Sequence, residues 1–272
     1  MKEYPRYSVL MSVYAKERAE WLREAIDSML HQTVPPSEIV LVEDGPLTEA
    51  LYNVISEYTK NSLFKIIVLK ENVGLGLALQ EGIKHCSNNL ITRMDTDDIS
   101  TPDRCEKEIQ KFIEDPSLDI VGCWENEFWN TTEKKFSCHK VPEKHKDIIE
   151  FMHYRCALLH PTVIFKKDAV LRAGNYQDRK LFEDYDLFVR MLQTKSKAYN
   201  LQEPLYFLRV NPTLFKRRGG FKYALTVLKF KYQLWRNGFF SFSNFILSGI
   251  GHCCVCLIPN WLRIIFYKSF LR

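Results

Sequence analysis

Acidic residues are absent from the last quarter of this 272-residue chain, because no Asp or Glu follows Glu203. The 69 residues after Glu203 contain eleven Lys and Arg, whereas residues 1–203 hold 27 basic and 33 acidic side chains, a net charge of −6. A basic segment that is also rich in aromatic residues predicts an anionic partner, either a nucleic acid or a phospholipid surface. The eleven basic residues are Arg209, Lys216, Arg217, Arg218, Lys222, Lys229, Lys231, Arg236, Arg263, Lys268 and Arg272.

The chain also lacks internal repeats, low-complexity stretches and any long, uninterrupted apolar run. Its mean hydropathy of −0.23, with 46% hydrophobic and 26% charged residues, excludes a polytopic membrane protein and predicts a substantial core. Residues 237–262 carry no charge and are long enough to cross a bilayer, but Ser, Asn, His and Pro side chains interrupt them. With Trp235 and Trp261 near its ends, this stretch predicts an anchor lying on the inner leaflet. The alternative is a helical pair packed on the core.

Paired cysteine spacing is lacking as well. The eight cysteines are scattered through predicted strands and helices, and Cys253-Cys254-Val255-Cys256 does not have the spacing of a zinc site. Residues 1–6 contain no apolar secretory segment, so we expect reduced thiols and a cytosolic location.

Apolar runs of strand length alternate with amphipathic stretches in the first hundred residues. This alternation predicts a parallel sheet covered by helices on both sides, an α/β fold. The second half is less regular and also mixes strands with helices. Strands are predicted over 8–14, 38–42, 64–69, 90–94, 119–129, 162–167 and 198–210, and helices over 17–32, 48–60, 75–85, 143–154 and 183–194.

Polar and acidic residues follow three of the predicted parallel strands. Ser12, Asp44 and the segment 95–98 stand at carboxyl ends, where α/β sheets bind ligands. The three carboxylates of Asp95, Asp97 and Asp98 repel one another unless a cation offsets them, and a hard divalent ion such as Mn²⁺ or Mg²⁺ is the natural occupant. The alternative is a solvated loop in which Asp98 or Ser100 caps a helix that begins at Pro102.

These motifs, taken in their order along the chain, resemble family 2 glycosyltransferases. The resemblance covers about residues 7–210 and implies the GT-A fold, an inverting mechanism and a nucleotide-sugar donor. Within this family the chain most resembles bacterial O-antigen and capsule transferases, including those that add β-linked galactose or glucose to N-acetylglucosamine on a lipid diphosphate. The matching segments are Ser8–Tyr14, Ser28–Thr33, Glu43–Gly45, Asn72–Gly76, Asp95–Asp98 and Pro102–Arg104.

The resemblance assigns a role to each matching residue. Ser12 and Asp44 stand where the family contacts the uridine, although Glu43 replaces the commoner first Asp of that pair. Asp95, Asp97 and Asp98 match the acidic motif that holds the ribose and the metal-bound diphosphate, with Asp97 and Asp98 as the expected metal ligands.

Two further motifs are expected to act at the acceptor side. Glu183-Asp184 matches the catalytic pair, with Asp184 as the general base; the alternative is a helix-capping role. His160 belongs to a His-Pro segment and is expected either to line the acceptor pocket or to be a buried structural histidine. Gly74-Leu75-Gly76 lacks the third glycine of a dinucleotide fingerprint.

The predicted activity is the transfer of one hexose, galactose first and glucose next, from a UDP-sugar to a lipid-linked saccharide at the cytoplasmic face of the inner membrane, without a nucleic-acid partner. The expected division is a catalytic domain over 1–210, with halves 1–100 and 101–210, and a basic membrane-associating segment over 211–272. The processive motif Gln-x-x-Arg-Trp is not evident, which favours single addition. The alternatives are a sugar-phosphate nucleotidyltransferase, which needs a glycine-rich basic loop after the first strand, and a non-catalytic saccharide-binding protein.

Overall fold

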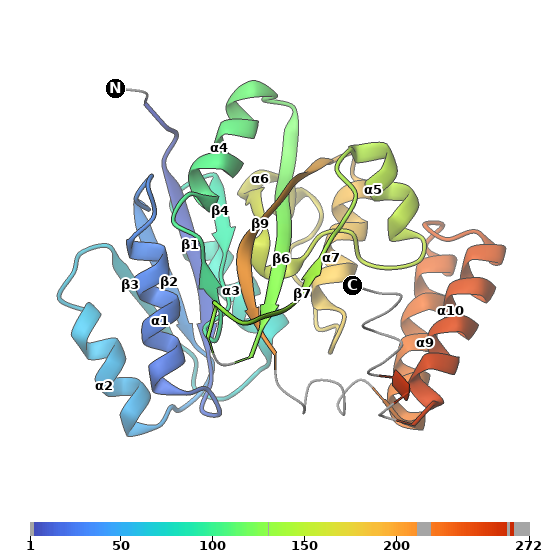
Figure 1. The fold of residues 1–272 in the computed structure, drawn as a ribbon, viewed down its shortest axis with the longest axis horizontal. Coiled ribbons are helices and arrows are strands. Elements are labelled where there is room, and N and C mark those ends of the chain that lie inside the picture. Colours follow the sequence, from blue (N-terminus) through green and yellow to red (C-terminus); the bar gives the residue numbers. More distant parts are fainter. Residues whose placement is uncertain (1–2, 130, 211–218, 260–261, 264–272) are drawn as a thin grey trace.

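The computed structural model describes residues 3–129, 131–210, 219–259 and 262–263. The first hundred residues form three strand–helix units followed by a fourth strand, as the alternation of apolar runs predicts (Figure 1). Their elements are β1 (Tyr7–Val13), α1 (Ala19–Leu30), β2 (Glu38–Glu43), α2 (Glu49–Tyr58), β3 (Phe64–Val68), α3 (Leu75–His85) and β4 (Leu90–Arg93).

The second half contains longer strands and the helices that cover them. Its elements are β5 (Ile99–Ser100), α4 (Arg104–Glu114), β6 (Leu118–Phe128), β7 (Lys135–His139), α5 (His145–Met152), the 3₁₀ turn η1 (His160–Thr162), β8 (Ile164–Lys166), α6 (Lys167–Arg172), α7 (Glu183–Gln193) and β9 (Lys197–Arg209). The sequence analysis did not predict β5, β7, η1 and α6, which are short segments without a clear period.

All of these strands belong to one sheet, in the order β3-β2-β1-β4-β8-β6-β9-β5, with β7 paired to β6. The strands β1 to β4 run parallel to one another, β8 runs antiparallel to both β4 and β6, and β6 pairs parallel with β9. The expected α/β fold with a mostly parallel sheet flanked by helices is therefore confirmed.

Alternate residues of each central strand face opposite layers of the molecule. Val9 and Met11 pack into one cluster with α1, α2 and α4, whereas Leu10 packs into another with α3, α6 and α7. Each fully buried aliphatic side chain contributes about 1.5–3 kcal/mol to folding. Strand β3 differs from the expectation, because it lies at the sheet edge and Val68 is 67% exposed.

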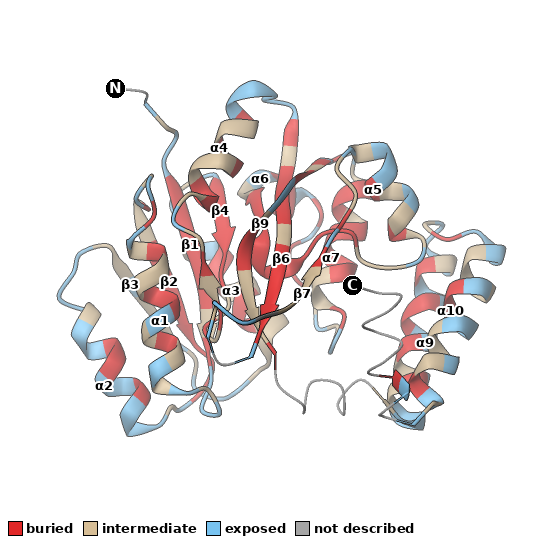
Figure 2. Ribbon diagram, viewed as in Figure 1, coloured by how far each residue is buried: buried red, intermediate tan, exposed pale blue. Residues whose placement is uncertain are grey.

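The chain ends in a helical hairpin of α9 (Phe221–Arg236) and α10 (Phe242–Leu257), which lie side by side at one end of the molecule (Figure 1). The inner face of α9 belongs to the same core as α7: the Phe230 ring stacks on Phe182 at 4.4 Å between centroids and contacts Tyr185 at 5.3 Å. The outer faces of both helices are exposed (Figure 2). Within the described part of the chain, no helix combines the length and the apolar composition needed to cross a bilayer.

Helix α4 corrects one alternative from the sequence. It begins at Arg104 rather than Pro102, Asp103 precedes it, and no side chain caps its first turn. Neither Asp98 nor Ser100 is a helix cap: Asp98 is bonded to β9, and the Ser100 hydroxyl accepts a hydrogen bond from Gln32 Nε2 at 3.2 Å. The solvated capping loop is therefore wrong.

Candidate active site

The three aspartates after β4 come together at the carboxyl edge of the parallel strands. One carboxylate oxygen from each of Asp95, Asp97 and Asp98 lies within 4.8 Å of the other two. Burial and the neighbouring Asp95 charge raise the pKa of Asp97 to about 7, and burial with the Asp97 and Asp95 charges raises the pKa of Asp98 well above its usual value. Such a crowded set of oxygens fits a hard divalent cation, which would favour the ionised forms of Asp97 and Asp98.

Strand β9 holds this acidic loop in place. The Tyr206 hydroxyl donates to Asp98 Oδ2 at 3.0 Å, and the Arg209 backbone N–H donates to Asp98 Oδ1 at 2.7 Å. Arg209 Nε also donates to the Asp97 carbonyl at 2.7 Å, while its guanidinium lies over the rings of Trp21 and Phe128. The closing strand thus supplies two residues of the site that the sequence analysis treated only as strand or as part of the basic tail.

Asp44 orders the loop that precedes α3. Its carboxylate accepts hydrogen bonds from the backbone N–H of Val73 at 2.7 Å and of Gly74 at 3.0 Å, and from Asn72 Nδ2 at 3.0 Å. Gly45 lies tightly against this loop with φ of +84°, where an added Cβ would be 2.5 Å from the Asn72 nitrogen. The Asn72–Gly76 motif and the Glu43–Gly45 motif are therefore one structural unit, and much of the acceptor capacity of Asp44 is used within it.

Glu43 and Ser12 stand beside Asp44 at the ends of β2 and β1. Glu43 is only 5% exposed, and burial raises the pKa of its carboxyl. Among the described residues its carboxylate has no hydrogen-bond or ion-pair partner, unlike that of Asp44. Ser12 is half-buried, and its carbonyl accepts a hydrogen bond from the Thr96 hydroxyl at 3.3 Å, which ties β1 to the acidic loop.

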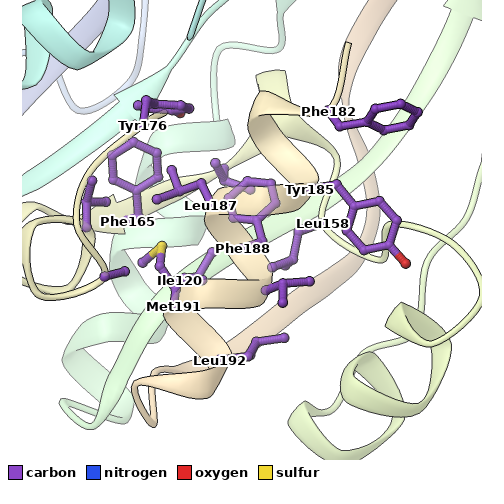
Figure 3. Close-up of a cluster of buried hydrophobic side chains, with 14 of the residues drawn as sticks. Ile120, Leu158, Phe165, Tyr176, Phe182, Tyr185, Leu187, Phe188, Met191 and Leu192 are labelled. Atoms are coloured by element: carbon purple, nitrogen blue, oxygen red, sulfur yellow. The ribbon is translucent and has the colours of Figure 1, made fainter. Parts of the chain in front are cut away.

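Glu183 and Asp184 form the first turn of α7, whose apolar face is anchored by a large hydrophobic cluster (Figure 3). Burial and the Asp184 charge raise the pKa of Glu183 to about 7. The turn before the helix is strained, since Leu181 has φ of +75°, a conformation that costs a non-glycine residue of order 1–3 kcal/mol. Gly76 at the start of α3 lies directly opposite, so that an added Cβ would be 3.0 Å from Glu183 Cβ.

His160 lies in η1, between the acidic loop and α7. It is 8% exposed, and its Nε2 lies 2.7 Å from the hydroxyl of the buried Tyr176. Burial and the Arg93 charge lower the pKa of His160 well below its usual value, so the imidazole is neutral. These contacts are those of a structural histidine; a role in the acceptor pocket stays a prediction.

Arg93 is a site residue that the sequence analysis missed. It ends β4, is fully buried, and forms an ion pair through Nη1 with Asp95 Oδ1. Its charge acts on Asp97, His160, Tyr176 and Glu183, so it stands between the acidic loop and α7. An arginine two residues before an acidic motif is visible in the sequence. Its burial is not, so nothing in the sequence marked Arg93 as a site residue rather than an ordinary strand residue.

Comparison with known proteins is consistent with this geometry. Residues 8–170 match the family described as "Glycosyl transferase family 2". The chain is 34% identical, over 98% of its length and 97% of the relative, to the Escherichia coli protein "UDP-Gal:alpha-D-GlcNAc-diphosphoundecaprenol beta-1,3-galactosyltransferase". It is 35% identical to the amylovoran biosynthesis glycosyltransferase AmsE of Erwinia amylovora, over 85% of this chain and 84% of AmsE.

Solved structures share the fold at low sequence identity. The mannosyltransferase PcManGT from Pyrobaculum calidifontis, in complex with GDP-Man and Mn²⁺, has a TM-score of 0.65 and 16% identity over 96% of this chain and 73% of that one. Residues 1–349 of S. aureus TarS, in complex with UDP-GlcNAc, have a TM-score of 0.63 and 16% identity over 85% of this chain and 66% of that one.

Proposed function

This chain belongs to glycosyl transferase family 2, and we propose that it transfers a single hexose, galactose first and glucose next, from a UDP-sugar to a saccharide on a lipid diphosphate. The observation that carries the proposal is that two acidic groups both act on the buried Tyr176: the Asp95–Asp98 loop, suited to a metal-bound diphosphate, and the Glu183–Asp184 pair at the start of α7. The name of the Escherichia coli relative supports the donor, the lipid-linked acceptor and a β-linked product. The biological setting is the synthesis of a surface polysaccharide, O-antigen or capsule.

A divalent cation, Mn²⁺ or Mg²⁺, would be held by Asp97 and Asp98. When bound, such an ion neutralises charge that develops on the departing diphosphate. Asp95, whose side chain is 30% exposed, is left to contact the nucleotide sugar together with Asp97. Tyr206 and Arg209 keep the loop in one conformation, so the carboxylates need little rearrangement when the ion arrives.

Asp184 acts as the general base. In an inverting transfer the acceptor oxygen attacks the anomeric carbon while the bond to the nucleotide breaks on the opposite face, and the hydroxyl proton passes to a carboxylate. The N-terminus of α7 favours the ionised form of that carboxylate. Glu183 lies beside the base, and its pKa of about 7 makes it half-protonated at neutral pH. A proton is proposed to be shared between the two carboxylates.

The nucleotide base is proposed to lie over Ser12 and the pair Glu43-Asp44. The sequence-based assignment gives the hydrogen bond from the uracil ring to Asp44. The free carboxylate of Glu43 makes that residue a second candidate for the same contact, because Asp44 already serves three donors of the 72–74 loop.

The outer face of the α9–α10 hairpin is proposed to rest on anionic phospholipid at the cytoplasmic face of the inner membrane. Exposed apolar side chains lie on both helices, which are close to each other where a Cβ added at Gly249 would be 3.5 Å from Leu228 Cδ1. Between residues 219 and 259 there is no acidic residue to oppose an anionic surface. These exposed side chains include Phe221, Leu225, Leu228 and Tyr232 on α9 and Leu247, Ile250 and Leu257 on α10.

The sequence predicted that all the basic residues of the tail serve this surface, but not all of them do. Side chains of three are buried: Arg209 binds the acidic loop, Lys231 donates to the Tyr154 carbonyl at 2.9 Å, and Arg263 donates to backbone carbonyls at the end of α10. Lys222, Lys229 and Arg236 are exposed. Lys216, Arg217, Arg218, Lys268 and Arg272, like Trp261, lie outside the described residues. The division into a catalytic part over 1–210 and a membrane-associating part over 211–272 remains a proposal.

A donor screen tests the proposed function. The full-length protein is incubated with Mn²⁺, a synthetic N-acetylglucosamine-diphosphate-lipid, and UDP-galactose, UDP-glucose or UDP-N-acetylglucosamine in turn, and products are followed by mass spectrometry. We expect one added hexose, with a β-anomeric coupling constant by NMR, and no product with Asp184→Asn. An α-linked product would exclude inversion, and absence of product with every UDP-sugar would contradict the proposed donor class.

A further inference from the structure

Arg93 is a fully buried cation whose hydrogen-bonding capacity is largely unused. Its contact with Asp95 is an ion pair through Nη1, while Nε and Nη2 have no hydrogen-bond acceptor among the described residues. Leaving donors of a buried guanidinium without acceptors is costly, and natural cores rarely tolerate it without a functional reason. The residue therefore calls for an explanation beyond packing.

The surroundings of Arg93 show what it does. The Asp95 side chain is 30% exposed, whereas the Arg93 side chain is 1% exposed, so solvent reaches the carboxylate but not the guanidinium. The Arg93 charge also acts on both members of the His160–Tyr176 pair and on Glu183 in the first turn of α7. A fixed positive charge at this position attracts both the acidic loop and Glu183.

We propose that Arg93 is a positioning residue of the transfer reaction: through its buried ion pair it fixes the Asp95 carboxylate toward the donor, and its positive charge attracts Glu183 at the start of α7. This inference rests on the proposed function and deepens it. It assigns no contact between Arg93 and the substrate, because solvent does not reach the guanidinium.

The direction of the electrostatic effect is fixed by the groups that face the acidic pair. The Arg93 charge lowers the pKa of Glu183, whereas Asp184 raises it. Removal of the cation must then raise the pH at which Glu183 becomes ionised. The charged and titratable groups around the pair are Arg93 on β4, Tyr176 after α6, Cys156 after α5, and Tyr185 on α7.

Two substitutions separate charge from geometry. Arg93→Gln removes the charge, and Arg93→Lys keeps the charge but loses the planar guanidinium that fits a carboxylate. The kcat and the donor KM are measured from pH 5.5 to 9 at saturating Mn²⁺, and UDP affinity in Mn²⁺ is measured by calorimetry. Arg23→Gln is the matched control, because Arg23 pairs with Glu57 on the surface, with side chains 43% and 52% exposed.

We expect the acid limb of kcat in Arg93→Gln to move up by about one pH unit, so that the deficit relative to the native protein shrinks about tenfold between pH 6 and 8.5. Arg93→Lys should keep the native acid limb and raise the donor KM several-fold. Both variants should bind UDP more weakly in Mn²⁺. A merely structural role would lower kcat equally at every pH and would overturn the inference.

The remaining outcomes also support or contradict the role of Arg93. If Arg93→Gln melts below the assay temperature, Arg93→Lys carries the test, and a native donor KM in that variant contradicts the proposal. If the native protein transfers no hexose, the proposed function fails, while the calorimetric comparison still judges Arg93: native UDP affinity in both variants would overturn its positioning role.

Discussion

The Tyr206 hydroxyl lies 3.0 Å from Asp98 Oδ2 and joins the end of the sheet's closing strand to the acidic loop 108 residues earlier in the chain. Asp98 also accepts a hydrogen bond from the Arg209 backbone, so it shapes the loop as well as offering an oxygen to a cation. The Asp97 carboxylate does not hold β9 in this way, although the Asp97 backbone carbonyl accepts a hydrogen bond from Arg209 Nε. The two aspartates therefore differ in what their removal would disturb.

Asp97→Ala should weaken UDP binding chiefly when Mn²⁺ is present, because its carboxylate acts through the ion. Calorimetry with Mn²⁺ and with EDTA measures this, and Asp98→Ala, which also releases β9, should lower thermal stability in addition. Equal loss of affinity with and without metal in Asp97→Ala would argue against a metal-ligand role.

Asp184→Asn should reduce kcat by two or more orders of magnitude and leave UDP affinity in Mn²⁺ nearly unchanged, since the amide keeps the shape but cannot take a proton. Single-turnover transfer and calorimetry on the same preparation provide the two readouts. Turnover close to the native rate would place the base elsewhere, with Glu183 the first residue to examine.

Glu43→Gln and Asp44→Asn distinguish the two candidate partners of the nucleotide base. If Glu43 accepts the hydrogen bond from uracil, Glu43→Gln should weaken UDP binding about tenfold with little effect on unfolding, because a charge-assisted bond is worth about 1.5–3 kcal/mol. Asp44→Asn should lower the melting temperature, since its carboxylate holds the 72–74 loop. Normal UDP affinity in Glu43→Gln would leave the role with Asp44.

The outer face of the hairpin can be tested without disturbing its inner face. Leu247→Ser with Ile250→Ser should reduce sedimentation with anionic vesicles, because both side chains are more than half exposed, at 64% and 54%. High salt should release the native protein only partly, since apolar burial is not screened. Exposed Leu171→Ser on α6 is the control. Undiminished vesicle binding by the double variant would rule out this face.

Truncation of the tail would not test membrane binding alone. Removal of residues after Val210 would strip Phe230 from Phe182 and Tyr185 and expose the helix that carries Glu183 and Asp184. A truncated protein that loses membrane binding would therefore also be expected to lose part of its stability.

Glu108 on α4 should make stability depend on pH. Burial raises the pKa of its carboxyl from 4.5 to about 8 in the folded protein, while nearby Arg104 lowers it. Between these values the folded chain holds a proton that the unfolded chain releases, so this group's contribution is complete below pH 4.5 and is lost as pH rises toward 8. Its slope cannot exceed about 1.4 kcal/mol per pH unit.

Urea unfolding of Glu108→Gln and the native protein at pH 5.5 and 8.5 measures the effect. The neutral amide does not titrate, so the variant should gain free energy of unfolding relative to the native protein at the higher pH. A difference between the two proteins that is the same at both pH values would show that Glu108 is ionised in the folded state.

Local sequence patterns were enough to predict the parallel half of the sheet. The apolar runs over 8–14, 38–42 and 90–94 and the helical periods between them depend on near neighbours, and β1, β2 and β4 lie within a residue of those bounds. The same reasoning placed the acids at the carboxyl edge, because a strand's direction follows from the chain itself.

Other features of the site depend on residues that are distant in the sequence, so only the tertiary structure decided them. Arg93 and Arg209 read as ordinary strand residues, and burial beside Asp95 or against Trp21 makes them part of the site. The strand order that inserts β8 between β4 and β6 brings η1 against both of these strands. Residue type and spacing determine local structure and chemistry, whereas burial and the partner of each charge arise from long-range packing, which no short window of sequence contains.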